Sequence, residues 1–115
     1  MSNGFDYSAA KHAKAVAMDQ VDLNANPAWK ELMIQLVRVV ALTHPTFTTD
    51  DVMILYHEIE DAPVTHEPRA LGPVMRSAAK LGYCHATDLV EKSIRASNHR
   101  RPLGVWQSLI YEGRA

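Results

Sequence analysis

The fold is decided by residues 68–109, PRALGPVMRSAAKLGYCHATDLVEKSIRASNHRRPLGVWQSL. Apolar residues recur at helical spacing over 68–81, and Gly82 follows them, which predicts a helix closed by a glycine. Alternating residues over 88–95 and 103–110 predict the two strands of a β-hairpin. The loop between the strands is basic. This stretch therefore predicts a helix with a cationic face, followed by a ribbon with a cationic tip.

Two helices are expected in the first part of the chain. A thin apolar face over 7–21 predicts the first helix. Asn26 and Pro27 mark the start of a second helix that runs to about Thr43, because Asn favours the N-cap and Pro favours the first helical position. The intervening residues form a loop.

A third helix is expected after a short extended segment at 46–48. Thr48 or Thr49 caps it, since a hydroxyl can accept a hydrogen bond from the free amides of the first turn. Asp50 and Asp51 lie in that turn, where negative charge is favourable to the helix dipole.

The predicted order is helix, helix, short strand, helix, helix, strand, loop and strand. It indicates a mainly α fold with a small β-hairpin, arranged as a winged helix-turn-helix with an extra N-terminal helix. We expect an N-terminal arm over 1–25 and a winged-helix domain over 26–115.

The second helix should form the centre of the core. The inward-facing residues of the three later helices are expected to be Trp29, Leu32, Met33, Leu36, Val37 and Val40; Val52, Leu55, Tyr56 and Ile59; and Leu71, Val74, Met75, Ala78 and Leu81.

Positive charge is concentrated in the second half of the chain. The formal net charge is −1, but residues 1–66 carry −5 and residues 67–115 carry +4. On a wheel of about 100° per residue, Arg69, Pro73, Arg76 and Lys80 fall on one face of the fourth helix. The arginines suit guanine edges or phosphates, and the lysine suits phosphate. The alternative interpretation is an ordinary solvated helix face. A proline inside this helix predicts a distorted first turn.

The hairpin loop is the second candidate contact surface. Its basic residues suit phosphates or a minor groove, and the hydroxyls of Thr48 and Thr49 at a helix start suit a phosphate. The alternative interpretation is a loop kept soluble by its charge. The cationic candidates on the hairpin are Lys92, Arg95, His99, Arg100 and Arg101.

The sequence offers no pattern for catalysis or for a cofactor. Its six histidines have no compact ligand spacing, and its single cysteine excludes an internal disulfide and is expected to be a small strand residue. The acidic residues 50–61 are better explained as helix-start and solvated charges than as a magnesium site. No phosphate-binding glycine loop or nucleophile motif is present. We therefore expect no catalytic residues, no metal, no cofactor and no enzymatic activity.

The sequence also predicts a cytoplasmic protein that does not enter a membrane. The first residues lack a basic and apolar leader. The longest apolar stretch, 32–42, is interrupted by Gln35 and Arg38 and is too short to span a bilayer.

Several linked motifs resemble those of small winged-helix proteins from actinobacterial phages and actinobacterial genomes. The resemblance covers about residues 26–108 and is carried by FTTDDV at 47–52, EPRALG at 67–72, KLGY at 80–83, KS at 92–93, SNHRRP at 97–102 and VWQS at 105–108. It implies a winged-helix fold and DNA binding, and an origin in a phage would place the protein in the host bacterial cytoplasm. Pro73 departs from the small or apolar residue usual at its position.

Together these features predict a non-enzymatic protein that binds double-stranded DNA, in transcription regulation or in DNA replication. A homodimer formed through the helix over 7–21 would add specificity. The alternative is a protein-interaction module that binds and modulates a host protein, since winged helices also bind proteins.

Overall fold

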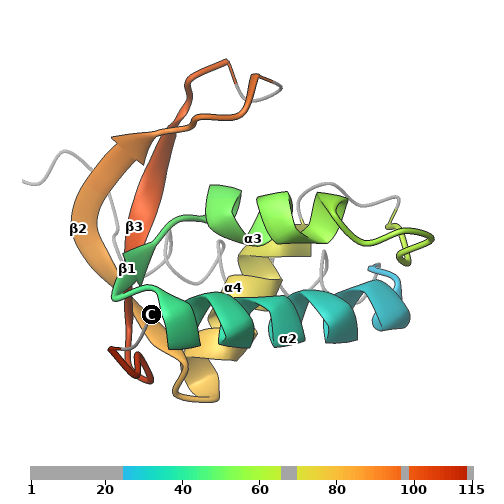
Figure 1. Ribbon diagram of the computed structural model, residues 1–115, viewed down its shortest axis with the longest axis horizontal. Coiled ribbons are helices and arrows are strands. Elements are labelled where there is room, and N and C mark those ends of the chain that lie inside the picture. The colour runs from blue at the N-terminus through green and yellow to red at the C-terminus, as the bar shows by residue number, and fades with distance from the viewer. Residues whose placement is uncertain (1–24, 66–69, 97–98, 114–115) are drawn as a thin grey trace, which may run out of the picture.

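The computed structural model describes residues 25–65, 70–96 and 99–113, and its longest helix is α2, Pro27–Thr43 (Figure 1). Asn26 Oδ1 accepts a hydrogen bond from the Ala28 amide at 2.9 Å, and Pro27 takes the first helical position, which confirms the predicted start. The predicted helix over 7–21 lies outside the described residues.

Three strands form one antiparallel sheet in the order β1-β3-β2. Their bounds are Thr46–Phe47 for β1, Cys84–Lys92 for β2 and Pro102–Ser108 for β3. The described residues thus form a compact α+β fold of three helices and a three-stranded sheet, in which the short extended segment pairs with the predicted hairpin. Figure 1 shows the sheet at one end of the helices, with the hairpin continuing beyond it.

The bounds predicted for both hairpin strands were wrong. β2 begins at Cys84, which pairs with Ser108, and an irregularity between Ala86 and Val90 then shifts the register. Thr87 bridges this irregularity by donating from Oγ1 to the Val105 carbonyl at 2.7 Å. Such a bulge breaks the alternation of side chains and bends the ribbon, so the sequence pattern conceals the first half of the strand.

The end of β3 is set by a buried serine. Ser108 Oγ donates to the Ala41 carbonyl of α2 at 2.6 Å and accepts from the Ile110 amide at 3.1 Å. The chain therefore turns away from the sheet two residues before the predicted end of the strand at 110.

Helix α3, Thr49–His57, begins as the sequence predicts. Thr48 Oγ1 accepts from the Asp50 amide at 3.2 Å, and Asp51 Oδ2 accepts from the Thr48 amide at 3.0 Å, so the two residues form a capping box. Ile59 was expected to face inward, but it is 39% exposed because the helix ends before it.

Helix α4, Leu71–Lys80, begins three residues later than predicted. Pro73 is therefore the third helical residue, where no helical hydrogen bond requires its missing N–H. The turn at Ala70 directly before α4 is 3₁₀ rather than α-helical, and Pro73 is buried rather than part of the cationic face.

The end of α4 is closed as predicted by Gly82, which has a φ of 85°. The Gly82 amide donates to the Ala79 carbonyl and the Tyr83 amide donates to the Ala78 carbonyl, both at 3.0 Å. This is a Schellman motif, in which glycine is favoured because it adopts the left-handed conformation without strain. Leu81 was expected to pack inward but is 57% exposed, because it lies at the cap after the last helical turn.

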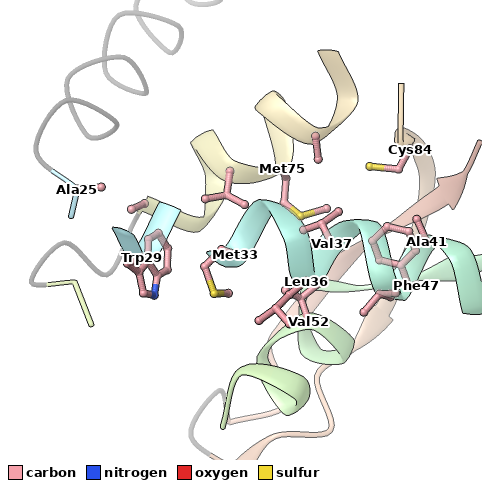
Figure 2. Close-up of a cluster of buried hydrophobic side chains, with 14 residues drawn as sticks. Ala25, Trp29, Met33, Leu36, Val37, Ala41, Phe47, Val52, Met75 and Cys84 are labelled. Atoms are coloured by element: carbon pink, nitrogen blue, oxygen red, sulfur yellow. The ribbon is translucent and has the colours of Figure 1, made fainter. Parts of the chain in front are cut away.

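The core is built around α2, as Figure 2 shows. Met33 and Val37 of α2 are fully buried, and side chains from both other helices and from the sheet surround them. Cys84 joins this cluster from β2, and burial raises the pKa of its thiol to about 11. The predicted inward faces of α2 and α4 are thus confirmed except for Leu81.

Candidate nucleic-acid interface

Helix α4 carries the first group of predicted contact residues. Arg76 and Lys80 are one turn apart, so their side chains extend from the same face of the helix. Lys80 is exposed and Arg76 is partly buried. Gly72, one turn before Arg76, is also exposed. Because glycine has no side chain, the helix surface is open to close approach near the start of α4. Arg69 lies outside the described residues.

The hairpin tip brings together four more of the predicted residues. Lys92, Arg95, His99 and Arg100 line a hollow of about 420 Å³, with the chain at 93–96 forming the rest of its wall. Lys92, His99 and Arg100 are exposed to solvent. Positive groups that converge on one concave surface create a local field that attracts anions.

The backbone at the tip is held in a conformation that most residues avoid. His99 has a φ of 49° and Arg100 has a φ of 60°, both in the left-handed region. A side chain there costs about 1–2 kcal/mol relative to the usual helical region, and glycine or asparagine is the common choice. Arg100, a cation, therefore stands at a position where folding alone favours other residues.

A larger hollow lies between α3 and the base of the hairpin. Its volume is about 670 Å³, and Thr49, Arg95 and Arg101 contribute to its wall. Arg101 is exposed, whereas Thr49 is partly buried. The rest of the wall is mostly apolar and is formed by Trp29, Met53, Tyr56, His57, Val64, Thr65, Leu71 and Leu103. Arg76 and Lys80 line neither of these two hollows.

Two of the predicted contact residues have structural partners that do not favour a direct nucleic-acid contact. Thr48 is 5% exposed, and its hydroxyl caps α3. The Arg95 side chain is 21% exposed, and its Nε lies 3.4 Å from Asp50 Oδ1, an ion pair without good hydrogen-bond geometry. Thr48 thus caps the start of α3, and Arg95 of the hairpin pairs with the same helix start.

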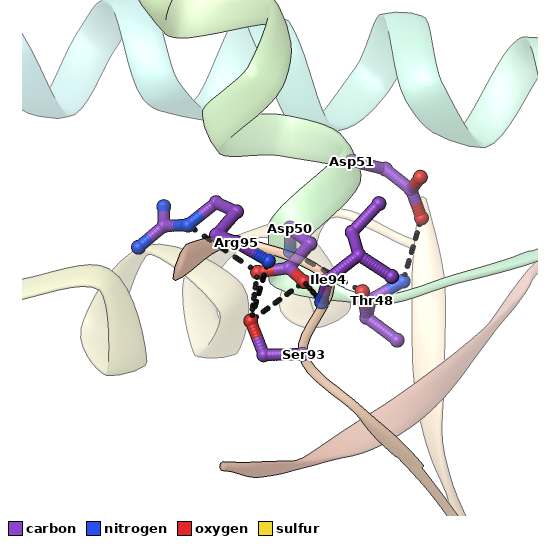
Figure 3. A network of polar contacts seen from close by, with 6 residues as sticks. All are labelled: Thr48, Asp50, Asp51, Ser93, Ile94 and Arg95. Atoms are coloured by element: carbon purple, nitrogen blue, oxygen red, sulfur yellow. Dashed lines mark hydrogen bonds and ion pairs between the residues drawn. The ribbon is translucent and has the colours of Figure 1, made fainter. Parts of the chain in front are cut away.

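Asp50 lies at the place where α3 and the hairpin meet (Figure 3), and its contacts with the hairpin were not predicted. Its carboxylate is buried, and Ser93 Oγ donates to both of its oxygens, at 2.9 Å and 2.8 Å. The Ile94 amide donates to Oδ2 at 2.7 Å. The sequence indicates the helix-start role of this aspartate, but no local pattern indicates partners more than 40 positions away.

Within residues 25–65, 70–96 and 99–113, no three His, Cys, Asp or Glu side chains gather in a way that could hold a metal ion. No helix in this part of the chain is both long and apolar enough to cross a bilayer.

Comparison of the chain with protein-family models, with curated proteins and with solved structures found no match. The functional inference therefore depends on the geometry and the charges of this chain.

Proposed function

We propose that this protein binds double-stranded DNA through the exposed face of α4 and the tip of the β2–β3 hairpin, without catalysing a reaction. It acts in transcription regulation or DNA replication in the cytoplasm of a bacterium, and it is encoded by a phage. Arg76 and Lys80 contact the major groove. Lys92, His99, Arg100 and Arg101 contact phosphates or the neighbouring minor groove.

The arrangement of elements supports this proposal. A helix, a short strand, two helices and a two-stranded ribbon follow one another, and the short strand pairs with the last strand of the ribbon. We propose that this is a winged helix-turn-helix, in which α4 is the recognition helix and the hairpin is the wing. A second copy, bound through residues 7–21, would double the contact area and supply specificity.

One observation carries the proposal more than any other, and that is the cationic cluster at the hairpin tip. Lys92, His99 and Arg100 surround one hollow, and two of them occupy left-handed backbone positions. Strained backbone is retained mainly where a side chain has a task that depends on its direction. An exposed group of cations on a projecting ribbon suits the polyanionic backbone of a duplex.

The first test is the salt dependence of binding to a labelled random duplex and to labelled genomic fragments. With about five phosphates neutralised, the slope of log affinity against log salt should be about −4 to −5. A preference for certain genomic fragments would reveal specificity. Absence of binding to any duplex at about 50 mM salt, where electrostatic association is strong, would overturn the proposal.

Reversal of charge at the hairpin tip tests whether the tip contacts DNA. The double variant Arg100→Glu/Arg101→Glu should abolish binding. The matched control, Lys30→Glu/Arg38→Glu, makes the same change in net charge on α2, away from the tip. It should weaken binding only slightly, by the general change in charge. Equal losses in both variants would show that location is irrelevant and would contradict a specific role of the tip.

A second candidate function is the binding of a host protein, and the exposed apolar residues of the hairpin favour it. Leu89, Val90 and Ile94 are 64%, 67% and 78% exposed, and β2 lies at the edge of the sheet. Exposed apolar groups on an edge strand can pair with another protein. Leu89→Ser/Val90→Ser should abolish capture of such a partner but leave DNA binding intact, whereas Arg100→Glu/Arg101→Glu should do the reverse.

A further inference from the structure

The buried carboxylate of Asp50 joins two elements that otherwise have little contact. Asp50 is the second residue of α3 and is 3% exposed. Its partners Ser93 and Ile94 lie directly after the end of β2, at the base of the hairpin tip. Figure 3 shows the carboxylate between these partners and the Arg95 side chain.

The position of these partners matters for the direction of the tip. The Ser93 amide donates to the Arg101 carbonyl at 2.8 Å, which extends the strand pairing by one rung beyond β2. Past this rung lies the tip, of which residues 94–96, His99 and Arg100 are described. The hydrogen bond that the Ile94 amide donates to Asp50 therefore fixes the chain at the point where it leaves the ribbon.

Little apolar packing is available to perform the same task. The hollow of about 670 Å³ separates Met53 of α3 from Leu103 of β3, and both side chains line it. Residues 88–92 of β2 are all exposed, so no side chain of this segment is buried against the helices. A ribbon with few packed neighbours can bend unless a specific contact holds it.

The capping of α3 does not require this burial. Thr48 and Asp51 form the capping box, and an acidic residue in the first turn would favour the helix dipole equally well in solvent. Burial of a carboxylate is unfavourable unless hydrogen bonds compensate for the lost water. The Ser93 hydroxyl and the Ile94 amide donate hydrogen bonds to Asp50, and the Arg95 guanidinium lies beside it, so groups of the hairpin supply that compensation.

We propose that Asp50 is a positioning residue, which holds the hairpin tip in the orientation that contacts DNA. This inference rests on the proposed function of the hairpin. Asp50 itself contacts no nucleic acid. It acts through the Ser93 hydroxyl and the Ile94 amide on the direction of the cationic side chains at 99–101.

The test compares Asp50→Ala with Asp51→Ala. Both variants remove one negative charge from adjacent positions in the first turn of α3, so general electrostatics should strengthen DNA binding equally in both. If Asp50 positions the tip, Asp50→Ala should instead weaken binding on the order of tenfold, because a mobile tip must be ordered on binding. Asp51→Ala should lower thermal stability without weakening binding. Equal effects of the two variants on affinity would overturn the proposal.

Two milder variants keep the test decisive if Asp50→Ala does not fold. Ser93→Ala removes the hydroxyl donor from the hairpin side and should weaken binding in the same direction. Asp50→Asn keeps an acceptor for the Ile94 amide and gains a donor for the Ser93 hydroxyl, so it should restore most of the affinity. Wild-type affinity in Ser93→Ala, or a loss in Asp50→Asn as large as in Ser93→Ala, would contradict positioning through these bonds.

Amide exchange in the DNA-free protein separates this inference from the proposed function. In Asp50→Ala, the Ile94 amide should exchange at least about tenfold faster than in Asp51→Ala, while amides in α2 remain protected alike in both. If the wild-type protein binds no duplex, the proposed function fails, yet this difference still demonstrates the anchor. If exchange at Ile94 is unchanged, the anchor fails, whatever the protein binds.

Discussion

At the scale of single residues, the thiol of Cys84 shows how the core excludes water. Cys84 is fully buried, and burial raises its pKa from 9.0 to about 11. The thiol therefore stays protonated near neutral pH, and a protonated buried thiol is a poor nucleophile. In the native protein we expect very slow reaction with Ellman's reagent at pH 8, and rapid reaction of one thiol after unfolding in guanidinium chloride.

The same shift has a consequence for stability at high pH. Below pH 9 the thiol is protonated in both the folded and the unfolded chain. Between pH 9 and pH 11 the unfolded chain releases the proton while the folded chain retains it, so the free energy of unfolding falls as pH rises. The difference in stability between the wild type and Cys84→Ala should shrink by about 2–3 kcal/mol across this interval. A constant difference in urea unfolding at pH 8.5 and pH 10.5 would contradict the shift.

At the scale of elements, the tip of the hairpin offers a test in which stability and binding move in opposite directions. Arg100→Gly removes a cation but relieves the left-handed backbone, so the free energy of unfolding should stay the same or rise by up to about 1 kcal/mol while DNA affinity falls. Arg101→Gly is the control, since Arg101 has no positive φ. It removes the same charge and should lower both quantities. Thermal melts and duplex titrations of the two variants give the comparison.

The elements also show which parts of the fold are predictable from sequence. The starts of α2 and α3 are predictable because an N-cap residue bonds to amides two or three positions away. The strand bounds are not, because a bulge hides the alternation in β2 and a bond from Ser108 to α2 ends β3. Both effects depend on residues far apart in the chain, which local periodicity does not register.

The candidate site also has some features that are predictable from local sequence and others that are not. The cationic tip is visible as a run of basic residues between two strand patterns, since composition and a turn are local features. The inward position of Arg95 and the buried role of Asp50 are not visible, because the ion pair between them joins distant segments. Long-range polar contacts of this kind require the tertiary structure.

At the scale of the whole molecule, α2 is the element on which the others pack. Met33 is fully buried at the centre of this helix, whereas Val39 on the same helix is 45% exposed. Met33→Ala should therefore lower the free energy of unfolding by about 2–5 kcal/mol, because it leaves a cavity that the surrounding side chains fill only partly. Val39→Ala should change it by less than about 1 kcal/mol. Chemical denaturation monitored by fluorescence measures both, and similar values would contradict a core centred on α2.

The anchor at the base of the hairpin uses a serine hydroxyl and a backbone amide, and the amide is present whatever side chain stands at position 94. Natural selection can therefore exchange residues 96–100 without removing the hydrogen bonds and the Arg95–Asp50 ion pair at the base of the tip. Related chains with the same body could recognise different targets by replacing this short segment. A protein engineer could use the same independence to graft a new recognition loop onto an unaltered scaffold.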